Sequence, residues 1–313
     1  MIKILITGGA GNVGGSLASR LVDNDNFFVV IVDNLLTGKK SNLPDESKKN
    51  WKFINCDVND IFQISSVMNT HNFDYVFHYA AVVGVKRTLE NPIMVLNDIN
   101  GIKNILELSK NTGVKRVFYS SSSEVYGEPV SLPQFEDTTP LNSKLPYAIV
   151  KNVGEAYFRS YFKSYGLEYT IFRFFNTYGP KQSEDFVISK FLNMAIRNDD
   201  ITLYGDGLQT RTFCYIDDNN DATINALINN EGINDTINIG NDVEFSILDL
   251  AKICIEVTGS KSKIVNLPPL KEGDMTRRKP DIQKMKKILN RDLTPLKDGI
   301  IKVFNARQQK INN

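Results

Sequence analysis

The sequence has few cysteines, and they lie far apart. The 313 residues include three, Cys56, Cys214 and Cys254, whose separations match neither a metal-binding spacing nor a disulfide framework. Reduced thiols of this kind are typical of proteins from a reducing compartment, so we predict a cytoplasmic location and no metal site.

The chain also lacks long apolar runs and an excess of charge of either sign. Its first apolar segment, Ile2 to Ile6, is too short for a signal peptide and leads directly into glycines. No run approaches the ~20 residues of a membrane-spanning helix. A net charge of +1 and a pI near 7.6 give no electrostatic footprint for nucleic acid or a membrane surface, so neither partner is predicted.

Hydrophobic residues make up 42% of the chain, enough for one large domain or two modest ones. The N-terminal part reads as a buried strand over 2–6, a glycine-rich turn over 7–15, an apolar helix, and a second strand over 28–32 that ends at Asp33. In this context glycines allow close approach of a dinucleotide pyrophosphate, and the helix N-terminus offers it free N–H groups. Asp33 would accept hydrogen bonds from a ribose diol and repel a 2′-phosphate, which favours NAD over NADP.

Strands and helices continue to alternate through the first half of the chain. Further strands are expected over 51–56, 74–79, 114–120 and 168–174, with helices over 61–70, 93–111 and 146–165. This order predicts an α/β fold with a doubly wound parallel sheet over residues 1–174. From residue 175 to 313, turns and short elements predict a smaller substrate-binding lobe. Its boundary is soft, because Asp235 to Ile239 reads as a strand that could return to the main sheet.

A cluster of hydroxyl groups follows the strand over 114–120, at the edge of the sheet where such folds bind ligands. Tyr147 and Lys151 come next, one helical turn apart on one helix face. A cationic Lys is expected to lower the pKa of a neighbouring phenol, which could then take a proton from a sugar hydroxyl while a hydride leaves the same carbon. Taken alone, Tyr-x-x-x-Lys is a common helix pattern and Ser-rich segments are common turns.

Four arginines fall in or beside turns, and the planar guanidinium suits a diphosphate. They are Arg173, Arg211, Arg277 and Arg278. For any one of them taken alone, an ordinary surface position is the simpler interpretation.

Several segments match, in order, the motifs of one family. They include Thr-Gly-Gly-Ala-Gly-Asn-Val-Gly (7–14), Ser-Ser-Ser-Glu-Val-Tyr-Gly (121–127) with Tyr147 and Lys151, Asn-Thr-Tyr-Gly-Pro (176–180), and Arg-Lys-Pro-Asp-Ile (278–282). Over nearly its whole length the chain resembles the extended short-chain dehydrogenase/reductases of the nucleotide-sugar epimerase/dehydratase group. The resemblance implies a Rossmann-type fold, NAD as cofactor, a nucleoside-diphosphate sugar as substrate, and a homodimer.

The resemblance also assigns roles to residues. Those expected to bind NAD are Gly8, Gly11, Asn12, Val13, Gly14, Asp33, Asn34, Asp57, Val58, Ala80, Ala81, Tyr147 and Lys151. The expected catalytic residues are Ser122, Tyr147, Lys151 and Glu124. Those expected to contact substrate are Ser122, Ser123, Asn176, Arg211 and Arg278.

The shared first step would be oxidation at C4 of the sugar, and the fate of the 4-keto sugar distinguishes the members of the family. Dehydratases use an Asp-Glu pair after the hydroxyl residue, but Ser123 stands where the Asp would be, which disfavours 4,6-dehydration. Ser123 and Glu124 are compatible with UDP-glucuronate decarboxylases, although Lys181 replaces the Arg that these usually carry after Gly-Pro. Asp98 also departs from the usual Asn.

We predict a net 4-epimerase, with a C4 dehydrogenase, a decarboxylase and a dehydratase as alternatives. The non-enzymatic alternative is a catalytically silent protein that senses nucleotides. The presence of Ser122, Tyr147 and Lys151 together argues against it, because a sensor has no need of a tuned phenol.

Overall fold

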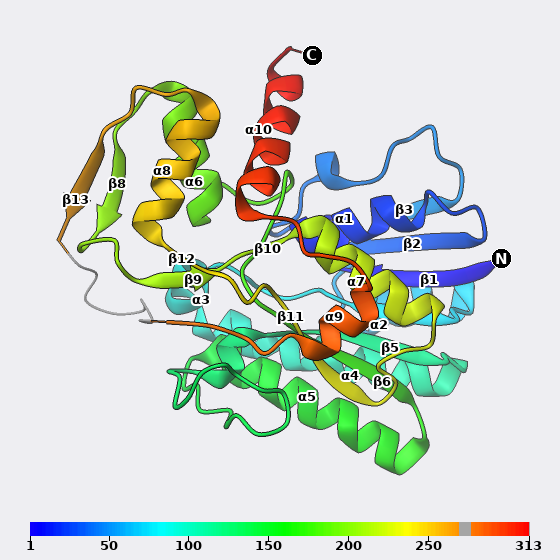
Figure 1. The fold of residues 1–313 in the computed structure, drawn as a ribbon. Helices are drawn as coiled ribbons and strands as arrows, with labels where there is room; N and C mark the ends of the chain where they lie inside the picture. The colour runs from blue at the N-terminus through cyan, green and yellow to red at the C-terminus, as the bar shows by residue number, and fades with distance from the viewer. Residues whose placement is uncertain (269–276, 313) are drawn as a thin grey trace.

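The computed structural model describes residues 1–268 and 277–312. Its centre is a seven-stranded parallel sheet with the strand order β11-β6-β5-β4-β1-β2-β3 (Figure 1). The strands are β1 (Ile2–Thr7), β2 (Phe27–Asp33), β3 (Trp51–Asn55), β4 (Tyr75–His78), β5 (Arg116–Ser122), β6 (Glu168–Phe174) and β11 (Asp235–Ile239). The central strands are rich in Val, Ile and Phe because a parallel sheet is covered on both faces.

Helices cover both faces of this sheet. The helices α2 (Ile61–His71), α4 (Pro92–Thr112) and α5 (Pro146–Tyr165) pack on one face, and α1 (Asn12–Leu21), α7 (Ile216–Ile228) and α9 (Gln283–Leu289) on the other. Side chains of β1 alternate between the two cores: Leu5 joins the first, whereas Ile4 and Ile6 join the second. The predicted doubly wound α/β fold is therefore confirmed.

The structure confirms the predicted start and end of helix α5. Pro146 is the first helical residue, where a missing N–H costs nothing, and the helix ends at Tyr165 before Gly166, which adopts a left-handed conformation with φ of 72°. Short elements that the sequence pattern did not indicate are α3 (Val85–Glu90) and the 3-10 turns η1 (Lys40–Asn42) and η2 (Ser123–Tyr126). The η2 turn directly follows β5 and holds Ser123 and Glu124 beside its carboxyl end.

A smaller lobe gathers much of the chain after β6. It contains α6 (Val187–Arg197), β8 (Ile201–Tyr204), α8 (Ile247–Thr258), β13 (Ile264–Leu267), and the small pairs β7 (Thr177–Tyr178) with β10 (Cys214–Tyr215) and β9 (Thr210–Thr212) with β12 (Glu244–Ser246). Its core includes Phe191, Leu250 and Cys254, together with Ile300 of α10 (Leu296–Asn312). As the sequence suggested, the segment Asp235–Ile239 leaves this lobe and pairs with β6 in the main sheet.

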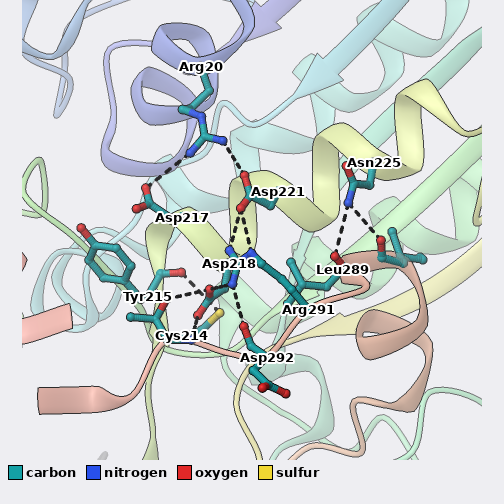
Figure 2. Close-up of polar contacts among 12 residues, drawn as sticks. Arg20, Cys214, Tyr215, Asp217, Asp218, Asp221, Asn225, Leu289, Arg291 and Asp292 are labelled. Atoms are coloured by element: carbon teal, nitrogen blue, oxygen red, sulfur yellow. Dashed lines mark hydrogen bonds and ion pairs between the residues drawn. The ribbon is translucent and has the colours of Figure 1, made fainter. Parts of the chain in front are cut away.

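An ion-pair network fastens the late segments to the N-terminal helix (Figure 2). Arg20 of α1 donates to Asp221 of α7 at 2.6 Å, and Arg291, between α9 and α10, donates to the same carboxylate at 2.6 Å. Arg291 also donates to the fully buried Asp218 at 2.7 Å. The network joins α1, α7 and the segment leading to α10 on one side of the sheet.

Membrane-spanning helices and metal clusters are both absent from the described part of the chain. Within 1–268 and 277–312, no helix combines the length and the apolar character needed to cross a bilayer. In the same ranges, no three His, Cys, Asp or Glu side chains gather in an arrangement that could hold a metal ion.

Candidate active site

A cavity of about 760 Å³ opens at the carboxyl ends of the central strands. Its lining comes from the turns after β1, β2, β3, β4 and β5, from the first turns of α5, and from the segments that follow β6. Open α/β sheets bind ligands at this edge. We call this space the central cavity.

The glycine-rich turn leaves backbone exposed at one end of the central cavity. Gly8 has φ of +67°, and a Cβ there would lie 2.7 Å from the backbone nitrogen of Ala80. A Cβ on Gly14 would lie 2.5 Å from the carbonyl oxygen of Gly8. Gly11 precedes α1 and provides no side-chain cap, so the first N–H groups of that helix are available to a phosphate.

The next group of lining residues fits an adenosine ribose. Asp33 is almost fully buried, and its carboxylate accepts hydrogen bonds from the N–H groups of Ala10 (3.0 Å) and Leu35 (2.8 Å). Asn34 donates to Asp57 at 3.2 Å. Two backbone donors fix the Asp33 carboxylate and leave lone pairs for a diol, so these residues fit NAD.

All thirteen residues predicted to bind NAD line the central cavity, including Asn12, Val13, Val58, Ala80 and Ala81. The small side chains after β4 keep the cavity open across the strand ends. The hydroxyl of Thr7 accepts hydrogen bonds from the N–H groups of Tyr79 and Ala80, both at 3.1 Å, and fixes this turn.

The predicted catalytic side chains meet in the same cavity. Ser122 is the last residue of β5, and Tyr147 and Lys151 lie on the first turns of α5. Ser122 acts on Tyr147 in the direction that lowers the pKa of the phenol, and its own Oγ accepts the N–H of Glu124 at 3.1 Å. The Lys151 ammonium donates to Ser120 Oγ at 3.3 Å and lies 5.8 Å from the centre of the Tyr147 ring. A sugar hydroxyl at this point would meet a phenol, an alcohol and an ammonium.

The pKa of Tyr147 differs from the expectation. Burial raises the pKa of this phenol well above its usual value, although Ser122 opposes the rise. Burial also lowers the pKa of Lys151 to about 8, against the attraction of Asp98. The lowering of the Tyr147 pKa that we expected from Lys151 is not found, because the loss of hydration around the hydroxyl dominates and the charges of Glu124 and Asp98 add to the rise.

Glu124 and Arg278 lie together, although the sequence assigned them separate roles. Two guanidinium nitrogens of Arg278 donate to the two carboxylate oxygens of Glu124, each at 2.7 Å, and one of them also lies 3.4 Å from Ser123 Oγ. All three residues line the central cavity. This pair is a bidentate, charge-assisted contact beside Ser122.

The other candidate arginines are placed differently. Arg173 is buried, so the ordinary surface position preferred for it is wrong, and it gives its guanidinium to Glu155, Tyr126 and the carbonyl of Glu136 rather than to the cavity. Arg277 is an exposed partner of Glu244. Arg211 donates to the carbonyl oxygen of Thr210 and lies outside the cavity lining, so its contact with substrate stays a prediction.

Asn176 lines the cavity, and its amide donates to the carbonyl of Thr212 at 2.9 Å. Lys181 is directed to the chain itself: its ammonium contacts Ser19 Oγ and the carbonyls of Asn42 and Gly15 at 2.7–2.9 Å. Sequence reasoning missed Arg87, a cavity residue whose guanidinium donates to the carbonyl of Val83 at 2.8 Å. The sequence pattern did not predict the short helix α3, and Arg87 belongs to none of the motifs matched above.

The sequence model of the "NAD dependent epimerase/dehydratase family" matches residues 4–240. The chain belongs to this family. It is therefore an NAD-dependent enzyme. A UDP-N-acetyl-alpha-D-glucosaminuronate decarboxylase from Bacillus cytotoxicus is 39% identical over 301 residues, which cover 91% of each protein. A UDP-glucuronic acid decarboxylase 1 from Danio rerio is 35% identical, covering 99% of this chain and 74% of the relative.

One solved structure has the same fold over its whole length. The UDP-glucose 4-epimerase of Thermotoga maritima, crystallised with UDP-glucose, has a TM-score of 0.92 and 32% identity, and covers 99% of this chain and 100% of that one. The chain is thus a member of a group of NAD-dependent enzymes that act on nucleotide sugars as epimerases, dehydratases and decarboxylases.

Proposed function

We propose that the protein oxidises C4 of a nucleoside-diphosphate sugar and returns the hydride to the other face of that carbon, as a net 4-epimerase. The observation that carries the proposal is the meeting of Ser122, Tyr147 and Lys151 in the cavity that the glycine-rich turn opens onto. When bound, NAD supplies a hydride acceptor. The side chains of this chain then have to orient the sugar and move one proton.

Tyr147 is placed to take the proton of the C4 hydroxyl, and Ser122 to hold the oxygen that becomes a carbonyl. Because burial raises the pKa of Tyr147, the phenol needs positive charge beside it before it can accept that proton. Lys151 supplies one such charge, and NAD would supply a second when bound.

Epimerisation requires no catalytic side chain beyond Ser122, Tyr147 and Lys151. Dehydration would need an acid near C5 and C6, and residue 123 is a serine. Lys181 directs its ammonium to Gly15, Ser19 and Asn42, which argues against its use as a clamp for a sugar carboxylate.

Decarboxylation of a nucleotide hexuronate is the second candidate, and one contact favours it. The Glu124–Arg278 pair brings a guanidinium to within 3.4 Å of Ser123 Oγ at the sugar end of the cavity, where a substrate carboxylate could compete for it. The similarity to two decarboxylases supports the same possibility.

The test is the mass and NMR spectrum of UDP-, GDP- and dTDP-sugars after incubation with the purified protein and NAD. Unchanged mass with inverted C4 stereochemistry is the expected result. A product that has lost carbon dioxide, water or two hydrogens would instead show that the reaction is decarboxylation, dehydration or simple oxidation.

Tyr147→Phe should reduce turnover by about 10²–10⁴-fold. Tyr204→Phe, at an exposed tyrosine of β8 outside the cavity lining, is the matched control. Full turnover in Tyr147→Phe would overturn the mechanism.

We also propose that two copies associate through the outer face of α5, in the cytoplasm. Phe162 and Tyr165 expose 40% and 59% of their surface on that helix, while Phe158 is buried in the core. Light scattering of the purified protein checks the dimer, and a monomer at micromolar concentration would contradict it.

A further inference from the structure

One buried amide connects the two segments that carry Glu124 and Arg278. The amide belongs to Asn238 of β11, which has no exposed surface. Its Oδ1 accepts a hydrogen bond from the hydroxyl of Tyr126 at 2.8 Å, and Tyr126 ends the η2 turn that holds Glu124. Its Nδ2 donates to the carbonyl oxygen of Asp281 at 3.1 Å, in the segment that begins with Arg278. The amide thus contacts both segments from outside the lining of the central cavity.

The partners of this amide fix its orientation. Nδ2 also donates to the carbonyl oxygen of Gln134 at 2.9 Å, so it faces two carbonyl groups, which can only accept. The hydroxyl of Tyr126 accepts a hydrogen bond from Arg173 and therefore uses its own proton for Oδ1 of Asn238. Rotating the amide by half a turn would place its oxygen against two other oxygens. Its nitrogen and its oxygen are both committed, and neither can be exchanged.

The backbone beyond Arg278 is held at the same point. Gln134, in the loop after η2, pairs with this segment as an isolated parallel bridge. Its N–H donates to the carbonyl of Lys279 at 2.8 Å, and its carbonyl accepts the N–H of Asp281 at 2.8 Å. Asn238 completes the arrangement, because its Nδ2 contacts the carbonyls of both bridged residues. These contacts fix the main chain from which the side chain of Arg278 extends.

The geometry of the Glu124–Arg278 pair depends on how its two segments lie. Arg278 is 7% exposed, and its two nitrogens meet the two carboxylate oxygens at the same distance, 2.7 Å. A planar guanidinium forms two such bonds only when the carboxylate has the matching position and orientation. Asn238 is a rigid planar group that contacts the main chain of one segment and the end of the other, so it sets that relationship.

Anchoring β11 does not require the Asn238 side chain. The main-chain N–H of Asn238 donates to Oε1 of Glu136 at 2.9 Å, and β11 pairs with β6 along its length. These main-chain contacts are available to any residue at position 238. The contacts with Tyr126, Gln134 and Asp281 need an amide.

We propose that Asn238 is a positioning residue, whose amide sets the guanidinium of Arg278 against Glu124 at the sugar end of the central cavity. It acts on substrate only through Arg278. The effect on turnover rests on the proposed function, whereas the effect on the placement of Arg278 does not.

The test compares the native chain with Asn238→Asp. This variant keeps the shape of the side chain and the acceptor for Tyr126, but it turns an oxygen toward the carbonyls of Gln134 and Asp281. Repulsion between these oxygens should displace the late segment and weaken the ion pair in the cavity. NMR of the labelled guanidinium of Arg278, assigned with Arg278→Met and recorded without substrate, should show hydrogen exchange faster by about tenfold or more.

Asn225→Asp is the matched control. Asn225 of α7 also donates its amide to two main-chain carbonyls, those of Ile288 and Leu289, at 3.1 and 3.5 Å (Figure 2). These residues lie outside the cavity lining. The control should lose stability for the same physical reason and leave the hydrogen exchange of Arg278 unchanged.

Turnover gives the second measurement. With the UDP-, GDP- or dTDP-sugar that the native protein converts, Asn238→Asp should lower kcat/KM by about tenfold. NAD affinity should be retained, because Arg278 is not among the residues expected to bind NAD. A general loss of structure would lower NAD affinity as well, and an equal fall in both quantities would overturn the positioning role.

Native hydrogen exchange at Arg278 in folded Asn238→Asp overturns the proposal, whatever reaction the protein catalyses. Equally fast exchange in Asn225→Asp also overturns it, because loss of stability alone would then explain the effect. Faster exchange in Asn238→Asp alone, in a protein that converts no nucleotide sugar, supports the role of Asn238 and contradicts the proposed function instead. If Asn238→Asp does not fold, Asn238→Ser removes the same donors without adding charge, and misfolding of both variants overturns the proposal in favour of a structural anchor.

Discussion

Arg173 and Glu155 form a bidentate ion pair inside the protein, with Nε and Nη2 donating to the two carboxylate oxygens at 2.8 and 2.7 Å. Ser121 Oγ donates to the same carboxylate at 2.6 Å. The pair thus joins β6, α5 and the end of β5 at one point. Because Ser121 precedes Ser122 and Glu155 lies one turn after Lys151, this contact fixes the catalytic strand against the catalytic helix.

Arg173→Met should lower the free energy of unfolding by about 3–5 kcal/mol, because it leaves a buried carboxylate without its cation. Arg159→Met is the matched control: Arg159 contacts the same Glu155, but its side chain is 43% exposed, and its loss should cost less than about 1 kcal/mol. Urea denaturation of both variants measures the difference. Equal losses would contradict the structural role assigned to Arg173.

Gly8→Ala should weaken NAD binding by roughly tenfold or more, because a left-handed alanine costs about 1–2 kcal/mol and its Cβ would meet the fixed backbone of Ala80. Isothermal titration with NAD gives the affinity. Gly113→Ala is the control, since Gly113 also has positive φ but open space around it at the end of α4. That variant should lose some stability and keep its NAD affinity; an equal loss of affinity would show that backbone strain alone explains the effect.

Gly154→Ala should destabilise the protein by about 1–3 kcal/mol through overpacking. A Cβ at this position would collide with the hydroxyl of the fully buried Tyr119, whose ring lies under the Lys151 ammonium. Turnover should fall as well, because the ring or α5 has to move. Ser160→Ala, at an exposed position on the same helix, should change stability by less than about 0.5 kcal/mol. Thermal unfolding that ranks the two variants equally would contradict this account.

Lys181→Met should lower stability by about 1.5–3 kcal/mol, because three acceptors on α1 and η1 lose a charged donor. NAD affinity should fall with it, since Gly15 and Asn42 neighbour the glycine-rich turn. Lys163→Met removes an exposed lysine from α5 and serves as the control in the same denaturation and titration experiments. Native stability in Lys181→Met would show that the contact contributes nothing.

The parts of the fold that local signals encode could be predicted from the sequence. Apolar runs, the glycine-rich turn, Pro146 and Gly166 placed the strands and helices of the first half to within a few residues, and the return of Asp235–Ile239 to the sheet followed from its strand pattern. The cavity lining contains all the residues predicted to bind NAD. Their contact with NAD stays a prediction. The confirmed parts of the fold share a cause, because each signal lies within one element or at its end.

The features that could not be predicted depend on contacts between distant segments. Glu124 and Arg278 are 154 residues apart, and no pattern in either segment indicates that they pair. Arg173 looks like other turn arginines until the fold buries it against Glu155. The pKa of Tyr147 was expected to fall because the sequence shows the neighbouring Lys151 but not how much water the fold removes from the hydroxyl.

The position of β11 has a consequence for how the chain is made. Strand β6 ends at residue 174, but the strand that covers its outer edge ends only at residue 239. At roughly 5–20 residues per second, a ribosome completes β6 several seconds before its partner emerges. During that interval the edge of β6, with Ile171 and Phe172 beside it, is open to pairing with other chains. Nascent chains stalled between these two strands should therefore be the ones that aggregate or recruit chaperones.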